Sequence, residues 1–177
     1  MLYIILGIIA IILLIIGIIF AIYYYKFQYL TIRMDEAENN IDILLQKKIE
    51  CISKLIPIIQ EKTKEKDFLA DFSTIREKDR NHFEMNESLK NSHIEIVKVI
   101  GDYEKLLKEE ELVTVLEGLE DNEEDLVASI KYYNDNVLDF NHLISSFPSN
   151  IIRIFLHLKK KNLYSTERKE IFEILKK

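Results

Sequence analysis

The chain is poor in the residues that interrupt helices. It has four glycines and two prolines among 177 residues, and after residue 25 only Gly101, Gly118, Pro57 and Pro148 remain. Because sheets and hairpins need turn residues at short intervals, this scarcity excludes a hairpin-rich fold. Glu, Lys, Leu and Ile are abundant and favour helices, so the sequence predicts a protein built from a few long helices.

Several kinds of chemistry are also missing. The single cysteine, Cys51, excludes a framework of internal disulfides and fits a reducing compartment. It lies on an apolar stripe, where we expect an inert, buried thiol. The sequence contains no Gly-rich phosphate loop, no His-Glu-x-x-His motif and no Cys-x-x-Cys pair. We therefore expect no catalytic residues, no cofactor and no enzymatic activity.

Charge is absent from the start of the chain. All charged residues follow Tyr25, so the net charge of −6 belongs to the part after that residue. Proteins that bind nucleic acids need clustered Lys and Arg to neutralise phosphates. An acidic domain suits this poorly, and we expect no nucleic-acid partner.

The sequence does contain a long apolar run, Leu2 to Tyr25, without a charge or a proline. A helix needs about 20 apolar residues to cross a bilayer. The run lacks the positive start and the cleavage site of a secretory signal. It therefore predicts a transmembrane helix over residues 1–25, followed by one cytoplasmic domain over residues 26–177.

The basic residues near the run predict its orientation. None precedes it, whereas Lys26, Arg33, Lys47 and Lys48 follow it. By the positive-inside bias, the chain after the span lies in the cytoplasm and Met1 lies outside. We thus expect a single-pass protein of the cell membrane, in contact with the lipid bilayer.

Four small residues of the run share one side of the helix. Gly7, Ala10, Gly17 and Ala21 fall within about 80° of one another at 100° per residue. A small-residue face lets two membrane helices approach closely, so it is a candidate for homo-oligomerisation. Chance in an Ile-rich helix is the alternative.

Apolar residues continue past the span at helical spacing, with Lys48 as the one polar member of the stripe. The stripe consists of Met34, Ala37, Ile41, Leu44, Lys48, Cys51, Leu55 and Ile58. We expect Pro57 to kink this helix and the helix to end near Lys66. Residues 76–93 have few apolar side chains and fit either a solvated helix or a flexible break.

Residues 109–146 have the clearest periodicity. Their apolar residues alternate four and three apart, which is typical of a helix that packs along one seam. The seam consists of Leu112, Leu116, Leu119, Glu123, Leu126, Ile130, Tyr133, Val137, Phe140 and Ile144. Pro148 should end this helix, and Ser149 or Asn150 can cap a last one.

These patterns together predict an all-α fold. We expect an N-terminal transmembrane helix that continues into an antiparallel bundle of three long helices, plus a short C-terminal helix.

The chain resembles the LemA family, most clearly through YYND and FPSN at their spacing within residues 116–155. The residues that carry this resemblance are Leu119, Glu120, Asp121, Tyr132, Tyr133, Asn134, Asp135, Val137, Asn141, Phe147, Pro148, Ser149 and Asn150. Upstream, the first helix matches through Arg33, Asp35, Glu36, Ala37, Ile41, Asp42, Lys47 and Lys48. The resemblance covers nearly the whole chain past residue 30.

The resemblance implies an antiparallel bundle anchored by one span, with no established catalytic activity. Members of this family are often encoded near membrane metalloproteases, which implies such a protease as a partner. This chain departs from the family pattern at two prolines. Ser53 stands where the family has a proline in its first helix, and Glu104 replaces the usual proline after the tyrosine at the turn.

Two Asp-x-x-His pairs, Asp79/His82 and Asp139/His142, approach the spacing of di-iron carboxylate sites. By helical geometry, Asp139 points about 130° and His142 about 170° away from the seam. Such side chains face solvent, so we expect no metal site.

Residues 109–125 carry nine acidic residues and no Lys or Arg. They are Glu109, Glu110, Glu111, Glu117, Glu120, Asp121, Glu123, Glu124 and Asp125. They form either a solvated helix face or a docking surface for a basic partner, whose binding would be salt-sensitive. Asn134 and Asn141 are seven residues apart, and we expect them to hydrogen-bond across the bundle.

We therefore expect a membrane-anchored, non-enzymatic bundle that acts as a scaffold or protein-interaction module at the cell membrane. The alternative is an accessory or regulatory subunit of a membrane enzyme such as a membrane metalloprotease. An exposed apolar groove would favour partner binding. A polar bundle surface would favour self-assembly through the span.

Overall fold

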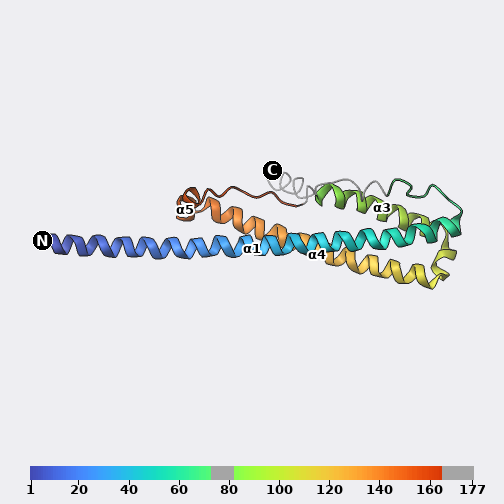
Figure 1. Cartoon of the computed structure of the whole chain (residues 1–177), viewed down its shortest axis with the longest axis horizontal. Helices are drawn as coiled ribbons and strands as arrows, with labels where there is room; N and C mark the ends of the chain where they lie inside the picture. The colour runs from blue at the N-terminus through green and yellow to red at the C-terminus, as the bar shows by residue number, and fades with distance from the viewer. Residues whose placement is uncertain (73–81, 165–177) are drawn as a thin grey trace, which may run out of the picture. The chain divides into compact units, whose positions relative to one another are not determined.

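The structure, a computed structural model, describes residues 1–72 and 82–164 and is helical almost throughout these ranges (Figure 1). The helices are α1 (Leu2–Thr63), α3 (His82–Asp102), α4 (Glu110–Ser145) and α5 (Ser149–Phe155), with a short 3-10 helix, η1 (Glu104–Lys108), before α4. No strand occurs in the described ranges. The all-α prediction of three long helices and a short C-terminal one is confirmed.

Helix α1 contains the whole apolar run and continues without a break to Thr63. It is the one described helix that is long and apolar enough to cross a membrane, and none of its most apolar stretch is buried. Pro57 lies inside the helix, near its end. The expected end near Lys66 is wrong by three residues, because Lys64 adopts a left-handed conformation (φ 64°) that terminates the helix.

Helix α3 contains part of the segment 76–93, for which the sequence did not decide between a helix and a flexible break. Residues 82–93 are helical, and residues 76–81 lie outside the described residues. Leu89, Ile96 and Ile100 are buried along one side of α3. These three residues recur at helical spacing, and their burial stabilises the helix against the rest of unit 2.

The chain divides into two compact units. Unit 1 comprises Met1–Ala37 and Tyr132–Lys177, and unit 2 comprises Glu38–Lys131. Helices α1 and α4 each contribute residues to both units.

The core of unit 1 forms where α1, α4 and α5 meet. Phe27 of α1 packs edge-on against Phe140 of α4, with ring centroids 5.8 Å apart and an interplanar angle of 73°. Met34, Val137, Ile144 and Ile152 complete the buried cluster. Aromatic pairs in this geometry contribute about 1 kcal/mol beyond their buried area.

The turn after α4 lies where the sequence predicted it, but Ser149 does not cap the next helix as expected. Helix α4 ends at Ser145, three residues before Pro148, as predicted. However, Pro148 occupies the N-cap position of α5, without a side-chain cap. The fully buried Ser149 instead donates its hydroxyl to the carbonyls of Leu143 (2.5 Å) and Ser146 (2.9 Å). Both carbonyls also accept backbone N–H groups, from Ser146 and Asn150 respectively. The Ser149 hydroxyl therefore adds a further contact between the turn and the end of α4.

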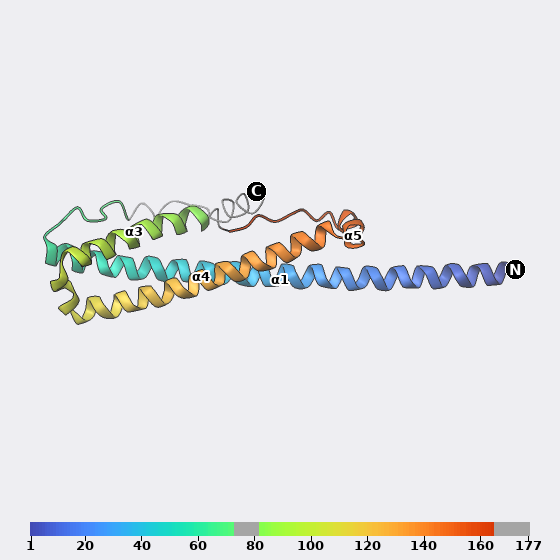
Figure 2. The same ribbon diagram turned by 180° about the vertical axis from the view of Figure 1, so that it is seen from behind.

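Unit 2 is a three-helix bundle with one parallel pair. Lys62 contacts Glu109 and Asn40 contacts Ser129, so α4 runs antiparallel to α1. Helix α3 runs in the same direction as α1, and α4 is antiparallel to both (Figure 2). Eighteen residues separate α1 from α3, which is enough chain to return to the start of the bundle.

The stripe and the seam predicted part of the buried core of unit 2, which also includes Leu45, Ile52 and Ile59 of α1. Ile41, Leu44 and Leu55 of α1 are fully or almost fully buried. So are the α4 seam residues Leu112, Leu119 and Leu126, all at 0% exposure.

Candidate functional site

The polar centre of unit 2 is an ion pair between the two charged members of the apolar seams. Lys48 of α1 has 0% side-chain exposure, and its ammonium contacts the Glu123 carboxylate of α4, which is 29% exposed. A buried ammonium needs a hydrogen-bonded counter-ion to be tolerated. The sequence identified both residues as exceptions on their seams but did not pair them.

Two further polar side chains adjoin this pair. Asn122, the residue before Glu123, is buried and donates its amide to the Leu44 carbonyl at 3.0 Å. His93 of α3 is half-buried and faces both charges. Burial lowers the pKa of His93 and the Lys48 charge lowers it further, while Glu123 and Glu120 oppose this. His93 was not among the residues predicted from the sequence, although its position between Leu89 and Ile96 places it at the edge of the buried side of α3.

The nine acidic residues of 109–125 do not form one continuous exposed set. Glu123 is paired with Lys48, and Glu109 forms an ion pair with Lys62 at 2.7 Å. The other seven side chains are exposed on α4: Glu110, Glu111, Glu117, Glu120, Asp121, Glu124 and Asp125. We call these seven the acidic face. Their exposure fits both a solvated surface and a docking surface.

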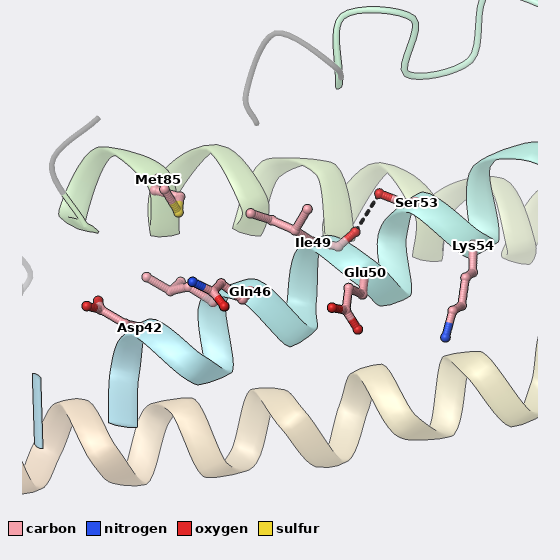
Figure 3. Close-up of a pocket in the computed structure, with 8 residues that line it drawn as sticks. Asp42, Gln46, Ile49, Glu50, Ser53, Lys54 and Met85 are labelled. Atoms are coloured by element: carbon pink, nitrogen blue, oxygen red, sulfur yellow. Dashed lines mark hydrogen bonds between the residues drawn. The ribbon is translucent and has the colours of Figure 1, made fainter. Parts of the chain in front are cut away.

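A groove of about 620 Å³ lies between α1 and α3 (Figure 3). Its lining comprises Asp42, Leu45, Gln46, Ile49, Glu50, Ser53 and Lys54 from α1 and Met85 from α3. It mixes charged, polar and apolar side chains, so it is not the apolar groove that would have favoured partner binding. The Ser53 hydroxyl donates to the Ile49 carbonyl at 2.7 Å, and the described residues of the lining include no histidine or cysteine that could activate it.

Cys51 is half-buried rather than buried as expected. Burial raises the pKa of its thiol, with Glu50 adding to the effect against the opposing charges of Lys54 and Lys47. A thiol that stays protonated is a poor nucleophile.

The Asp-x-x-His pair on α4 is exposed at both residues, Asp139 and His142, as the helical geometry predicted. Asp79 and the side chain of His82 lie outside the described residues. Within residues 1–72 and 84–164, no group of three or more His, Cys, Asp or Glu side chains is arranged to hold a metal ion.

Tyr133 and Asn134 of the YYND motif, together with Asn141, hold the chain that follows α5. Asn141 makes two hydrogen bonds to the Lys161 backbone, at 2.8 and 2.9 Å. The buried Asn134 accepts the Tyr164 N–H at 2.7 Å. Tyr133 packs edge-on against the Tyr164 ring, with centroids 6.0 Å apart. The two asparagines thus share a face, as predicted, but they bind a returning segment rather than a facing helix.

The remaining motif residues occupy distinct positions. Tyr132 lies under the Arg33 guanidinium, 5.9 Å from ring centroid to Cζ. Asp135 and Phe147 are exposed, whereas Pro148 and Asn150 are half-buried. These contacts are structural, and none assembles a nucleophile with a base.

The fold and these sites define an all-α helical-bundle protein with one long apolar N-terminal helix. The family model described as LemA family matches residues 37–174, well over half of the chain. The chain therefore belongs to the LemA family, as the sequence resemblance indicated. LemA is not known as an enzyme family. Comparisons with curated proteins and with solved structures give no significant match.

The two members of the buried ion pair should respond unequally to substitution. Glu123→Gln leaves the fully buried ammonium of Lys48 without an anion and should cost about 3 kcal/mol of the free energy of unfolding. Lys48→Met should cost less, because the Glu123 carboxylate is partly exposed and can hydrate. The double variant Lys48→Met/Glu123→Leu should recover most of the stability. Urea unfolding of the detergent-solubilised protein, followed by circular dichroism, measures these values.

Glu124→Gln is the matched control, since Glu124 is exposed and adjacent in sequence. It should change the unfolding free energy by less than about 0.5 kcal/mol. Equal losses for Glu123→Gln and Glu124→Gln would show that the pair does not stabilise unit 2.

His93 should make the stability of unit 2 fall in mild acid. Its pKa in the folded state lies below the ordinary value of 6.5, so below that pH the unfolded chain binds more protons than the folded one. Stability is therefore greatest above pH 6.5 and declines as the pH falls through the window between the two pKa values. Urea midpoints at about pH 7.5 and about pH 5.5 should differ less for His93→Gln than for the natural chain. An identical difference in both proteins would contradict this role.

Proposed function

We propose that this protein is a membrane-anchored, non-enzymatic scaffold whose helical bundle binds a protein partner at the cytoplasmic surface of the cell membrane. The observation that carries the proposal is the continuity of α1. The same helix supplies an uncovered, charge-free apolar run and, directly after it, Phe27 and Met34 of the unit 1 core. Anything that binds the bundle is thereby tethered to a bilayer through α1.

Retention of the apolar run, rather than its cleavage as a signal, is supported by packing. Tyr23 lies within the run and packs against the core cluster, and Phe27 belongs to the cluster itself. Removing the run would delete Tyr23 and leave Phe27 on a frayed helix end. Residues 1–25 as the span and residues 26–177 as the soluble domain fit this arrangement.

The cytoplasmic placement rests on charge. Lys26 follows the run directly, and Arg33 lies eight residues after its end. Short basic flanks of this kind remain on the cytoplasmic side.

The acidic face is the docking surface that we propose for a basic partner. It lies on α4, and its residues within Glu117–Asp125 are all exposed without basic neighbours in that stretch of sequence. Electrostatic complementarity of this kind raises association rates and makes binding sensitive to salt. A membrane enzyme with a basic cytoplasmic segment would fit the accessory-subunit alternative. Homo-oligomerisation through Gly7, Ala10, Gly17 and Ala21 would need no acidic face.

Crosslinking in intact membranes, followed by mass spectrometry, tests the proposal. We expect a second protein crosslinked at the acidic face, and we expect its recovery to fall at high salt. The variant Glu117→Lys/Asp121→Lys/Glu124→Lys should lose this crosslink at least about tenfold, since it reverses three charges of one face.

The matched control reverses three exposed acidic residues elsewhere, as Glu95→Lys/Asp102→Lys/Asp139→Lys. It changes the net charge equally and should keep the crosslink. Crosslinks only between copies of the chain, or equal losses in both variants, would contradict docking at the acidic face.

A further inference from the structure

Helix α5 exposes an apolar surface that no described residue of unit 1 covers. Phe147, Ile154 and Phe155 are 79%, 67% and 70% exposed, and Ile151 is 48% exposed. The opposite side of this short helix packs inward through Ile152, which is 6% exposed. Soluble proteins usually expose large apolar side chains singly, whereas here four of them lie together on one turn and the helix that follows it.

The position of α5 along α1 indicates what covers this surface. Ile152 shares the unit 1 core with Phe27, which lies two residues after the apolar run, and Tyr23 and Leu156 pack against the same cluster. Both views show α5 beside α1 (Figures 1 and 2). The apolar surface therefore lies at the level where the run ends.

The length of the run places that level at the lipid headgroups. Its 24 residues, Leu2–Tyr25, extend about 36 Å at a rise of about 1.5 Å each, whereas the hydrocarbon core is about 30 Å thick. The last turn, with Tyr23, Tyr24 and Tyr25, then lies in the interfacial region that tyrosines prefer. Helix α5, which is packed against this turn, lies in the same layer.

The charge around α5 matches an anionic surface. Residues 147–164 contain Arg153, Lys159, Lys160 and Lys161 and no Asp or Glu, although the chain as a whole has a net charge of −6. Arg153, Lys159 and Lys160 line a hollow of about 430 Å³ together with Ile154, His157 and Leu158. Basic groups beside exposed Phe and Ile side chains are typical of helices that lie in a membrane interface.

We propose that α5 and the residues that follow it, 147–161, form a second membrane contact that binds anionic lipid headgroups beside the span. Phe147, Ile154 and Phe155 enter the boundary between headgroups and acyl chains, and Lys159, Lys160 and Lys161 bind the phosphates. This contact rests on the proposed anchoring through α1. Two attachments fix the orientation of unit 1 at the membrane, which a single helix does not.

Tryptophan fluorescence tests the contact in the full-length protein, which has no natural tryptophan. Phe155→Trp is reconstituted into vesicles of phosphatidylcholine, or of phosphatidylcholine and phosphatidylglycerol in equal parts, each with and without brominated acyl chains. We expect a blue-shifted emission and quenching by the brominated lipid that is about twofold stronger in the anionic vesicles. Lys159→Glu/Lys160→Glu in the same background should reduce the quenching to the level of the neutral vesicles.

Phe20→Trp, inside the apolar run, separates this inference from the proposed anchoring. It should be quenched in both kinds of vesicle. If it is quenched while Phe155→Trp is not, the second contact is wrong and the anchoring stands. If neither is quenched, both are wrong. A blue shift at residue 155 without quenching would mean that protein, a second copy or a partner, covers α5, and it would overturn the lipid contact.

Folding of the probes is checked independently. Phe155 is exposed, so its replacement by tryptophan should leave the circular dichroism unchanged. Ile154→Trp, at a second exposed position of the same surface, should give the same pattern of quenching.

Discussion

The burial of the Lys48 ammonium is the constraint on which the packing of unit 2 depends. An apolar seam of Leu and Ile is tolerant of register, because a shift by one turn replaces one aliphatic contact by another. A fully buried cation is not tolerant, since a shift of one turn, about 5.4 Å, would leave it without its counter-ion. Lys48 and Glu123 therefore select one register for α1 against α4. Lys62 with Glu109, Asn40 with Ser129 and Asn122 with the Leu44 carbonyl all occur in that same register.

In unit 1, the side-chain amides of two asparagines fix the position of the packed segments. Asn134 and Asn141 bind the backbone of Tyr164 and Lys161, so the segment after α5 is held along α4 without a helix of its own. This arrangement also keeps α5 packed against the C-terminal end of the apolar run. Exposing the apolar side chains of Phe147 and Phe155 to water is unfavourable and promotes aggregation. The same side chains stabilise the position of α5 if they insert into an adjacent bilayer.

The periodicity of the sequence was sufficient for the helices and for most of the core. The seam from Leu112 to Ile144 predicted α4 within a residue or two, because a helix must keep its apolar residues on one side. Periodicity identifies a face but not the partner of that face. It could not pair Lys48 with Glu123, 75 residues away, nor show that α3 runs parallel to α1, since the long connection permits either direction.

The candidate site was predicted less well, for a related reason. A count of acidic residues does not distinguish Glu109 and Glu123 from their exposed neighbours, yet both form ion pairs with lysines of α1. Ser149 was expected as a possible cap because Ser commonly precedes helices, but two carbonyls at the end of the previous helix, those of Leu143 and Ser146, compete for its hydroxyl. Such competition is decided by three-dimensional neighbours, which one sequence does not specify.

The central claim is that residues 2–25 anchor a cytoplasmic bundle, and protease accessibility in sealed membrane vesicles tests it most directly. One portion of the membranes is extracted with alkaline carbonate, and a separate, untreated portion is exposed to protease as sealed inside-out or right-side-out vesicles. The account predicts that the chain stays with the membrane after extraction and that residues 26–177 are digested only in inside-out vesicles. Release of the chain by carbonate, or digestion of the bundle in right-side-out vesicles, would contradict it.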